Sequence, residues 1–272
     1  MSQLDPSELQ ALVTEIIAAK KYQQVGLAES TVRDLLEKEL PYHRQTKDAV
    51  KAVKKKLHTI VAPYLGDPDY PAAASALEGA FAKGDPQAIR DACAALMGAH
   101  ASTRERLPFL DQFYAALFAI TGRPASILDL ACGLNPLAFP WMGLPPSTAY
   151  YAYDLNQPRI QLINRFFALM GMEPRGAAQD ILVDVPAQSA DVAFFFKEAH
   201  RFDQRERGCN RSFWPAIRAR WLLVSLPTSS LSGKHNLLQR QRQLVAETIQ
   251  GQPWRVTEVS IDKELVFCID KR

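Results

Sequence analysis

The stretch from Ile127 to Pro136 contains the residue types and spacing best suited to chemistry in this chain, in the order Ile-Leu-Asp-Leu-Ala-Cys-Gly-Leu-Asn-Pro. An apolar segment, predicted as a strand over residues 126–131, runs into a turn of small residues. The proline that follows is suited to the first turn of a helix. Because small side chains let a ligand approach the backbone and the exposed N–H groups of that helix, the stretch predicts a ligand-binding loop.

The glycine spacing of this loop narrows the class of ligand. It has neither the Gly-x-Gly-x-x-Gly pattern of dinucleotide-binding loops nor the Gly-Lys-Ser/Thr ending of phosphate-binding loops, so S-adenosylmethionine is favoured over NAD and nucleoside triphosphates. A second predicted strand, over residues 149–154, ends in Asp154, whose carboxylate is suited to accept hydrogen bonds from both hydroxyls of a ribose. An aspartate at a strand end is also typical of a helix cap, and Asn156 is itself a candidate cap.

Two more residue patterns bear on the chemistry. Gln179 and Asp180, after the next predicted turn, are suited to accept from the amino group of an adenine, but equally suit an ordinary turn. The chain has no Gly-x-Ser-x-Gly elbow and its five histidines form no His-Glu-x-x-His motif, so a hydrolase is poorly supported. Cysteines at positions 93, 132, 209 and 268 show no paired spacing, which argues against a disulfide framework or a zinc site and favours buried thiols.

The elements that position these residues follow from the spacing of apolar side chains. From about residue 6 to residue 121 apolar residues recur at helical spacing, with breaks at Gly26, Pro41, residues 63–71 and residues 84–86. Beyond residue 122 strands and helices alternate, which predicts a parallel sheet with helices on both faces. The expected strands are residues 126–131, 149–154, 191–196 and 221–226, followed after a helix over 236–249 by a hairpin of 255–261 and 264–269.

We therefore expect an α/β fold with two domains, as the length of 272 residues suggests. The first, residues 1–105, is all-helical, and the second, residues 106–272, is Rossmann-like. A helix from Ala101 to Ile120 is expected to join them.

Positive charge is clustered in two windows of the sequence. Residues 41–60 hold six Lys and Arg residues against one Asp, and residues 201–242 hold nine against two acidic residues. Two basic segments around a mildly acidic middle suit a polyanion, because each neutralised phosphate releases counterions. Either cluster alone could be a solvated helix face, but the two together favour nucleic acid. No stretch reaches the roughly 18 apolar residues of a membrane span, and the polar N-terminus does not look like a secretory signal.

Several motifs resemble the aminoglycoside-resistance 16S rRNA methyltransferases that modify N7 of guanine 1405. The combination of His-Ala-Ser-Thr-x-Glu-Arg-Leu at residues 100–107 with the loop at residues 129–136 is specific. Further similarity lies at residues 19–22, 179–180, 226–228 and 263–265, so that the resemblance spans nearly the whole chain.

The resemblance implies a class I S-adenosylmethionine-dependent methyltransferase domain and assigns its cofactor-binding residues. Arg106 is a fitting partner for a carboxylate because its planar fork binds in bidentate fashion, although a surface charge paired with Glu105 would look the same in sequence. The implied contacts are to the methionine carboxylate from Thr103 and Arg106, to the body of the cofactor from Ala131, Gly133 and Leu155, to the ribose from Asp154, and to the adenine from Gln179 and Asp180.

Methyl transfer to guanine N7 needs little from the protein beyond alignment. The attacking lone pair carries no proton, so no general base is required, and catalysis rests on holding the reactants in line. The target guanine is expected to be flipped out or exposed. Lys197, which follows the strand over residues 191–196, is the predicted catalytic residue that orients the base or a phosphate; otherwise it is a solvated lysine at a strand end.

The helical domain is expected to dock on folded ribosomal RNA by shape and phosphate contacts. The candidate RNA-binding residues are Lys54, Lys55 and Lys56 from the first basic window and Arg205, Arg207 and Lys234 from the second. The sequence departs from the family pattern at target-side positions, with Glu198-Ala199-His200 in place of Leu-Leu-Pro and Ser229 in place of a basic residue. The stretch at residues 233–238 also departs. These differences concern the target base more than the reaction type.

The expected function is S-adenosylmethionine-dependent methylation of 16S rRNA in the 30S subunit at N7 of guanine 1405, giving resistance to 4,6-disubstituted deoxystreptamine aminoglycosides. The partner is the 30S ribosomal subunit at its decoding region, and we expect a cytoplasmic monomer without membrane contact or a metal. Open alternatives are a methyltransferase for another rRNA base, a small-molecule methyltransferase, and a non-catalytic S-adenosylmethionine-binding RNA module.

Overall fold

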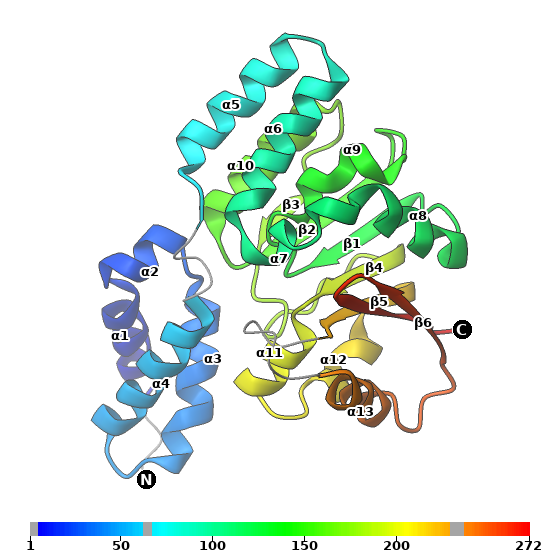
Figure 1. The fold of residues 1–272 in the computed structure, drawn as a ribbon. Coiled ribbons are helices and arrows are strands. Elements are labelled where there is room, and N and C mark those ends of the chain that lie inside the picture. The colour runs from blue at the N-terminus through cyan, green and yellow to red at the C-terminus, as the bar shows by residue number, and fades with distance from the viewer. Residues whose placement is uncertain (1–4, 62–66, 229–236) are drawn as a thin grey trace.

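Four helices at the N-terminus form a bundle with a hydrophobic cluster of its own. The computed structural model describes residues 5–61, 67–228 and 237–272. Within it, the bundle stands beside the central sheet, in blue in Figure 1. Asp5 begins the first helix with a capping box that includes Glu8. The bundle consists of α1 (Pro6–Ile17), α2 (Lys20–Val25), α3 (Glu29–Glu39) and α4 (Thr46–Val61), with a short 3₁₀ turn, η1 (Leu40–Tyr42), before α4.

The next two helices, α5 (Tyr70–Ala82) and α6 (Pro86–Ala99), form a hairpin that belongs to a different core. Leu77 and Met97 are fully buried in the same hydrophobic cluster as one face of the sheet. Along the chain, the change from the first core to the second therefore falls between α4 and α5, whereas the sequence predicted the domain boundary at residue 105. Apolar periodicity identifies the buried stripe of a helix, but it does not say which core that stripe joins.

The single helix predicted from Ala101 to Ile120 is wrong, because the chain breaks there into three pieces. It forms a short helix α7 (Ala101–Arg104), a 3₁₀ turn η3 (Leu107–Phe109) and helix α8 (Leu110–Thr121). Pro108 lies in the 3₁₀ turn, where it has no N–H to give to an α-helical hydrogen bond. The break leaves Arg106 on a bend between helices rather than on a continuous helix.

A seven-stranded sheet with the order β3-β2-β1-β4-β5-β7-β6 lies at the centre of the second core. Its first five strands are parallel, and β7 and β6 form an antiparallel hairpin on β5. All the predicted strands are confirmed. The sequence missed one further strand, β3, because its three residues, Gly-Ala-Ala, carry no β-branched side chain. The strands are β1 (Ser126–Leu130), β2 (Ala149–Asp154), β3 (Gly176–Ala178), β4 (Ala190–Phe196), β5 (Ala219–Pro227), β6 (Arg255–Ile261) and β7 (Glu264–Asp270).

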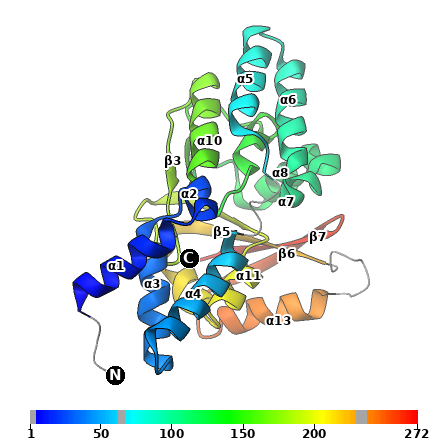
Figure 2. The same cartoon turned by 90° about the vertical axis from the view of Figure 1, so that its left-hand side faces the viewer.

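Helices cover both faces of this sheet, as Figures 1 and 2 show. Successive strand residues point to opposite faces, so Phe194 and Phe196 join the cluster on one face and Phe195 joins the cluster on the other. One face carries α8, η4 (Asn135–Ala138), α9 (Phe139–Met142) and α10 (Gln157–Leu169), with the α5–α6 hairpin against α10; the other carries α11 (Ala199–Arg205), α12 (Asn210–Ala216) and α13 (Leu238–Thr248).

The strand order reverses between β1 and β4, which makes a topological switch point. In open α/β sheets, ligands bind in the crevice at the carboxyl ends of the strands beside such a point. The Rossmann-like fold expected from the sequence is thus confirmed. Within the described ranges, no helix is both long and apolar enough to cross a bilayer.

Candidate cofactor pocket and RNA-facing surface

A cavity of about 500 Å³ opens at the carboxyl ends of β1, β2 and β4. This volume is typical of small-molecule sites. Lys56, Thr59 and Ile60 of α4 also line the cavity, so the N-terminal bundle contributes one of its walls. All eight sequence-predicted cofactor residues line this one cavity, namely Thr103, Arg106, Ala131, Gly133, Asp154, Leu155, Gln179 and Asp180.

The loop after β1 holds its backbone in the left-handed region at two positions. Ala131 has a φ of 54° and Gly133 a φ of 55°. A side chain at position 133 would also be crowded, because a Cβ there would lie 3.2 Å from Cε1 of His100. For alanine this conformation is uncommon and costs energy, and such strain concentrates at functional sites. The small residues identified in the sequence are thus required both by the turn and by its close neighbours.

Asp154 at the end of β2 is buried and held by three donors. Its Oδ2 atom accepts from the backbone N–H of Gly133 at 3.0 Å and from Nη1 of Arg159 at 2.9 Å, and its Oδ1 atom accepts from the N–H of Asn156 at 2.9 Å. Because a carboxylate offers about four acceptor positions, at most about one remains for a ligand hydroxyl. The sequence had suggested room for both hydroxyls of a ribose. Asn156 caps α10, as predicted, by accepting from the N–H of Arg159.

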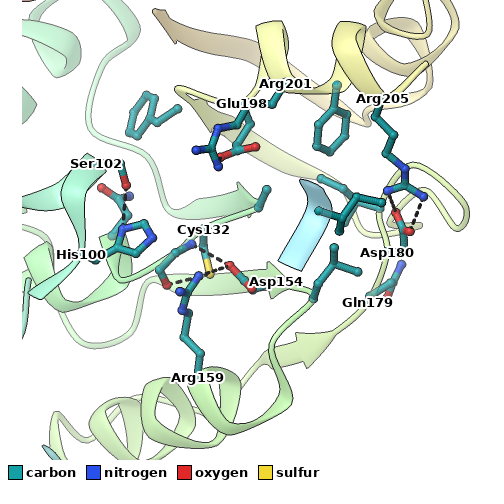
Figure 3. A pocket seen from close by; sticks show the side chains of 18 of the residues that line it. His100, Ser102, Cys132, Asp154, Arg159, Gln179, Asp180, Glu198, Arg201 and Arg205 are labelled. Carbon is teal, nitrogen blue, oxygen red and sulfur yellow. Dashed lines mark hydrogen bonds and ion pairs between the residues drawn. The ribbon is translucent and has the colours of Figure 1, made fainter. Parts of the chain in front are cut away.

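Asp180 lies on the side of the cavity opposite His100 and Ser102, as Figure 3 shows. Arg205 on α11 donates to both of its oxygens, at 2.9 and 2.6 Å. The N–H of Leu182 adds a third hydrogen bond at 3.2 Å, which begins a turn. Arg205 had been predicted from the sequence to contact RNA; instead its side chain is 9% exposed and bound to this carboxylate.

Arg106 is nearly fully buried and presents its guanidinium to the cavity through a fixed set of contacts. Nε and Nη2 donate to the two carboxylate oxygens of Glu264 at 3.2 and 2.5 Å, and Nη1 donates to Oδ1 of Asn135 at 2.7 Å. The guanidinium carbon lies 4.3 Å from the ring centroid of Phe113 and 4.7 Å from that of Phe196. Arg106 is therefore the centre of a buried network and not a surface charge paired with Glu105.

Glu264, the first residue of β7, is a residue of this site that sequence reasoning did not assign. Burial would raise the pKa of its carboxyl, but the charges of Arg106 and Lys197 outweigh that effect and lower it. The side chain is therefore ionised at neutral pH. In the sequence it looks like the start of a hairpin strand, and nothing local connects it to Arg106.

The network continues beneath the loop to Asp129. Its Oδ2 atom accepts from Nδ2 of Asn135 at 2.9 Å and from the hydroxyl of Tyr150 at 2.7 Å. Burial raises the pKa of Asp129 to about 7, although both hydrogen bonds act in the opposite direction. This aspartate supports the loop from below and does not line the cavity.

Thr103 and His100 line the cavity on the α6–α7 side. The Thr103 hydroxyl donates to the carbonyl of Met97 at 2.7 Å, so a ligand carboxylate would compete with that carbonyl for the proton. His100 Nδ1 lies 2.8 Å from Oγ of Ser102. Burial lowers the pKa of His100 to about 4, so the imidazole is neutral at physiological pH.

Lys197 follows β4 with a φ of 61°, and its ammonium group is turned toward the α7 region. Nζ lies 2.6 Å from Glu105, 3.3 Å from the carbonyl of Ser102 and 3.5 Å from Glu264. The side chain is 10% exposed, and it lies beside the cavity rather than among the residues that line it. Its predicted catalytic role stays a prediction.

The next residue, Glu198, does line the cavity. Burial raises the pKa of its carboxyl to about 7, although Arg201, 3.4 Å away, acts in the opposite direction. The sequence had singled out Glu198 only as a departure from the family pattern. Carboxyl groups whose pKa is raised by burial beside a cavity are common in functional sites, so Glu198 is a candidate site residue.

The remaining RNA candidates are distributed over different parts of the surface. Lys54 and Lys55 are exposed on α4, and Lys54 lies 3.5 Å from Glu15. Lys56 pairs with Glu39 at 2.6 Å at the rim of the cavity. Arg207 is exposed after α11, and Lys234 lies outside the described residues.

The described residues of the second basic window, 201–228 and 237–242, do not form one surface. Arg218 and Arg220 lie at the amino end of β5, whereas the cavity is at the carboxyl ends of the parallel strands. Arg242 on α13 is engaged by Glu258 of β6 at 2.7 Å. The charge count of this window therefore overstates the positive potential near the cavity.

The chain resembles known proteins over nearly its full length. The family model described as ribosomal RNA methyltransferase (FmrO) matches residues 18–268. The 16S rRNA (guanine(1405)-N(7))-methyltransferase of Frankia casuarinae is 36% identical over 249 residues, which cover 90% of this chain and 88% of the relative. The enzyme of the same name from Micromonospora echinospora is 34% identical over 260 residues, 94% of each chain. The crystal structure of 16S rRNA methyltransferase RmtF in complex with S-adenosyl-L-homocysteine has a TM-score of 0.78 at 28% identity, covering 99% of this chain and 100% of that one.

Proposed function

Since the chain belongs to the FmrO family of ribosomal RNA methyltransferases, we propose that it methylates N7 of guanine 1405 in 16S rRNA with S-adenosylmethionine as the methyl donor. The observation that carries the proposal is the cavity at the switch point of the sheet, around which all eight predicted cofactor residues meet. Relatives with 36% and 34% identity carry the name of this activity.

The residues of the cavity fit S-adenosylmethionine by their chemistry. Arg106 offers a buried guanidinium for the methionine carboxylate, with Thr103 beside it. Asp154 keeps an acceptor position for a ribose hydroxyl, and Asp180, with Gln179, offers acceptors for the amino group of an adenine. Ala131, Gly133 and Leu155 supply a lining with small residues in the loop, where a ligand can approach the backbone.

The chemistry asks the protein mainly for alignment and exclusion of water. When bound, S-adenosylmethionine supplies an electrophilic methyl group, and guanine N7 carries a lone pair and no proton, so no residue must remove one. Lys197, anchored by Glu105 and Glu264 at the end of β4, orients the target base or a neighbouring phosphate. Phe196 and Phe202 provide apolar walls around the reacting groups.

The helical N-terminal domain docks on the ribosomal RNA. Its helix α4 exposes Lys54 and Lys55 and at the same time contributes Lys56 to the rim of the cavity. Phosphates bound along α4 therefore lie next to the cavity mouth, and Arg207, exposed after α11, is a further candidate phosphate contact. We propose that α1 to α4 carry this contact, within the domain that the sequence placed at residues 1–105.

The biological setting follows from the substrate. We propose that the protein acts as a cytoplasmic monomer on the decoding region of the assembled 30S subunit. A methyl group and a positive charge at N7 of guanine 1405 would confer resistance to 4,6-disubstituted deoxystreptamine aminoglycosides.

The test is transfer of labelled methyl groups from S-adenosylmethionine to intact 30S subunits and to naked 16S rRNA, with the modified nucleotide mapped. Asp154→Asn serves as the cofactor-site variant and Asp111→Asn, an exposed position on α8, as its matched control. We expect N7-methylguanine at position 1405 on 30S subunits only. Label at another base would overturn the target, and absence of label despite cofactor binding would favour a non-catalytic RNA module or a small-molecule methyltransferase.

A further inference from the structure

Two arginines each join a carboxylate of the cavity to a second aspartate, which comes before α5 in the chain. Arg159 contacts Asp154 and Asp67, and Arg205 contacts Asp180. Arg205 also lies 4.0 Å from Asp34 on α3. In Figure 3 these two arginines occupy separate sides of the cavity, each beside its carboxylate. The same arrangement thus occurs at the predicted positions of the ribose and of the adenine of the cofactor.

The bridge that Arg159 forms between Asp154 and Asp67 is buried, and both of its ion pairs are at hydrogen-bond distance. Nη1 lies 2.9 Å from Oδ2 of Asp154, and Nη2 lies 2.5 Å from Oδ1 of Asp67. The side chains of Arg159 and Asp67 are only 2% and 6% exposed. Asp67 also accepts from Nδ2 of Asn156 at 3.0 Å and from the hydroxyl of Tyr70. Asp67 comes two residues before Asp69, the N-cap of α5, so this bridge ties the start of α5 to the end of β2.

Other contacts join the N-terminal bundle to α10 and α11. Lys38 on α3 lies 2.6 Å from Glu206, the residue after Arg205. At the end of α2, a Cβ at Gly26 would come within 2.6 Å of Cβ of Gln157, the first residue of α10. The bundle is therefore packed against the elements that carry both arginines, at the start of α10 and the end of α11.

We propose that Arg159 and Arg205 are positioning residues that orient Asp154 and Asp180 for the cofactor, and that Asp67, before α5, and Asp34, on α3, complete their geometry. The inference rests on the proposed function, because it assigns how the cofactor carboxylates of that site are held. Cofactor affinity then depends on α3 and on the start of α5, although Asp67 and Asp34 do not line the cavity.

The second aspartate affects cofactor binding because each guanidinium shares its N–H donors between two carboxylates. Arg159 splits its donors between two carboxylates, which fixes its plane and leaves one acceptor position of Asp154 open. Without the charge of Asp67, the buried guanidinium gains by turning further onto Asp154, where it competes with a ribose hydroxyl. By linkage, a movement of the start of α5 that weakens this bridge weakens cofactor binding, and cofactor binding favours the intact bridge by the same factor.

The experiment is titration calorimetry of S-adenosylhomocysteine against the full-length protein and its Asp67→Asn variant. The matched control is Glu78→Gln, which removes the 2.7 Å pair between Glu78 on α5 and Arg165 on α10. That pair also joins α5 to α10, but it contacts neither the cavity nor Asp154. Asp34→Asn tests the weaker bridge, and Arg159→Lys keeps the charge at position 159 but not the fork.

We expect Asp67→Asn to raise the dissociation constant at least about fivefold, Asp34→Asn to raise it by less, and Glu78→Gln to leave it unchanged. In methyl transfer, KM for S-adenosylmethionine should rise in Asp67→Asn while kcat at saturation is kept, a split that a general loss of folding does not produce. Arg159→Lys should resemble Asp67→Asn.

Equal affinity of Asp67→Asn, Glu78→Gln and the unaltered protein would overturn the positioning role and leave the methyltransferase proposal standing. A loss of kcat without a change in KM would overturn it as well. Failure of the unaltered protein to bind S-adenosylhomocysteine would overturn both proposals together, which separates the two kinds of failure.

Discussion

Arg106 and Glu264 are 158 positions apart in the chain and form a buried bidentate ion pair at the end of the sheet where the parallel strands finish. Both side chains are 2% exposed. With Nη1 of Arg106 bound to Asn135, the guanidinium is held on three sides and faces the cavity between two phenylalanine rings. The same glutamate lies 3.5 Å from Nζ of Lys197. One carboxylate thus positions both the predicted cofactor-binding arginine and the predicted catalytic lysine.

Replacing Glu264 with Gln should destabilise the protein and weaken cofactor binding together. It leaves Arg106 without its charged partner in a buried site, which typically costs about 3–5 kcal/mol. Thermal unfolding and calorimetry with S-adenosylhomocysteine measure the two effects. The control is Glu258→Gln, which removes the more exposed pair with Arg242 and should cost no more than about 1 kcal/mol. Equal effects of the two substitutions would contradict the role given to Glu264.

Replacing Lys197 with Ala should reduce turnover on 30S subunits by about 10- to 100-fold with little change in cofactor affinity, because its proposed role is to orient the target and it does not line the cavity. Single-turnover methyl transfer and calorimetry separate the two quantities. Lys263→Ala, at an exposed turn between β6 and β7, is the control. Loss of cofactor binding in Lys197→Ala would reassign the lysine to the cofactor pocket.

Reversing the charges of Lys54 and Lys55 to Glu should weaken 30S binding and flatten its salt dependence, with the log–log slope falling by about 0.7–0.9 for each phosphate that the protein no longer neutralises. Lys56→Glu is tested separately because that lysine pairs with Glu39. The control, Lys83→Glu, lies after α5, in the turn at the end of the α5–α6 hairpin that points away from α4 (Figure 1). Unchanged subunit binding would assign these lysines to ordinary surface.

Replacing Glu198 with Gln should remove a pH dependence of stability. Burial raises the pKa of this carboxyl from 4.5 to about 7 in the folded protein. The folded state therefore holds the proton more tightly than the unfolded state, and stability is lost as pH rises from about 4.5 to about 7. Glu198→Gln lacks this loss. Its free energy of unfolding, relative to that of the unaltered protein, should therefore rise between these two pH values and level off at a difference of no more than about 3 kcal/mol. Unfolding at several pH values measures it, and parallel profiles for both proteins would contradict the prediction.

The sequence alone was sufficient for β1, the loop after it and β2. The loop after β1 was recognised because its small residues interrupt an apolar strand, and Asp154 because it ends the next strand. Since parallel strands bring their carboxyl ends to one edge, these residues had to meet. The capping role of Asn156 followed in the same way from local chemistry. These features depend on neighbours within a few residues of the chain.

The partners of those residues were decided only by the tertiary structure. Glu264 reaches Arg106 because β7 inserts between β5 and β6, so that this antiparallel strand begins at the edge where the parallel strands end. Arg205 looked like an RNA contact, but α11 turns it inward onto Asp180. Local periodicity specifies an element and its buried face. Which distant element covers that face is set by strand order and packing, and these depend on the whole chain at once.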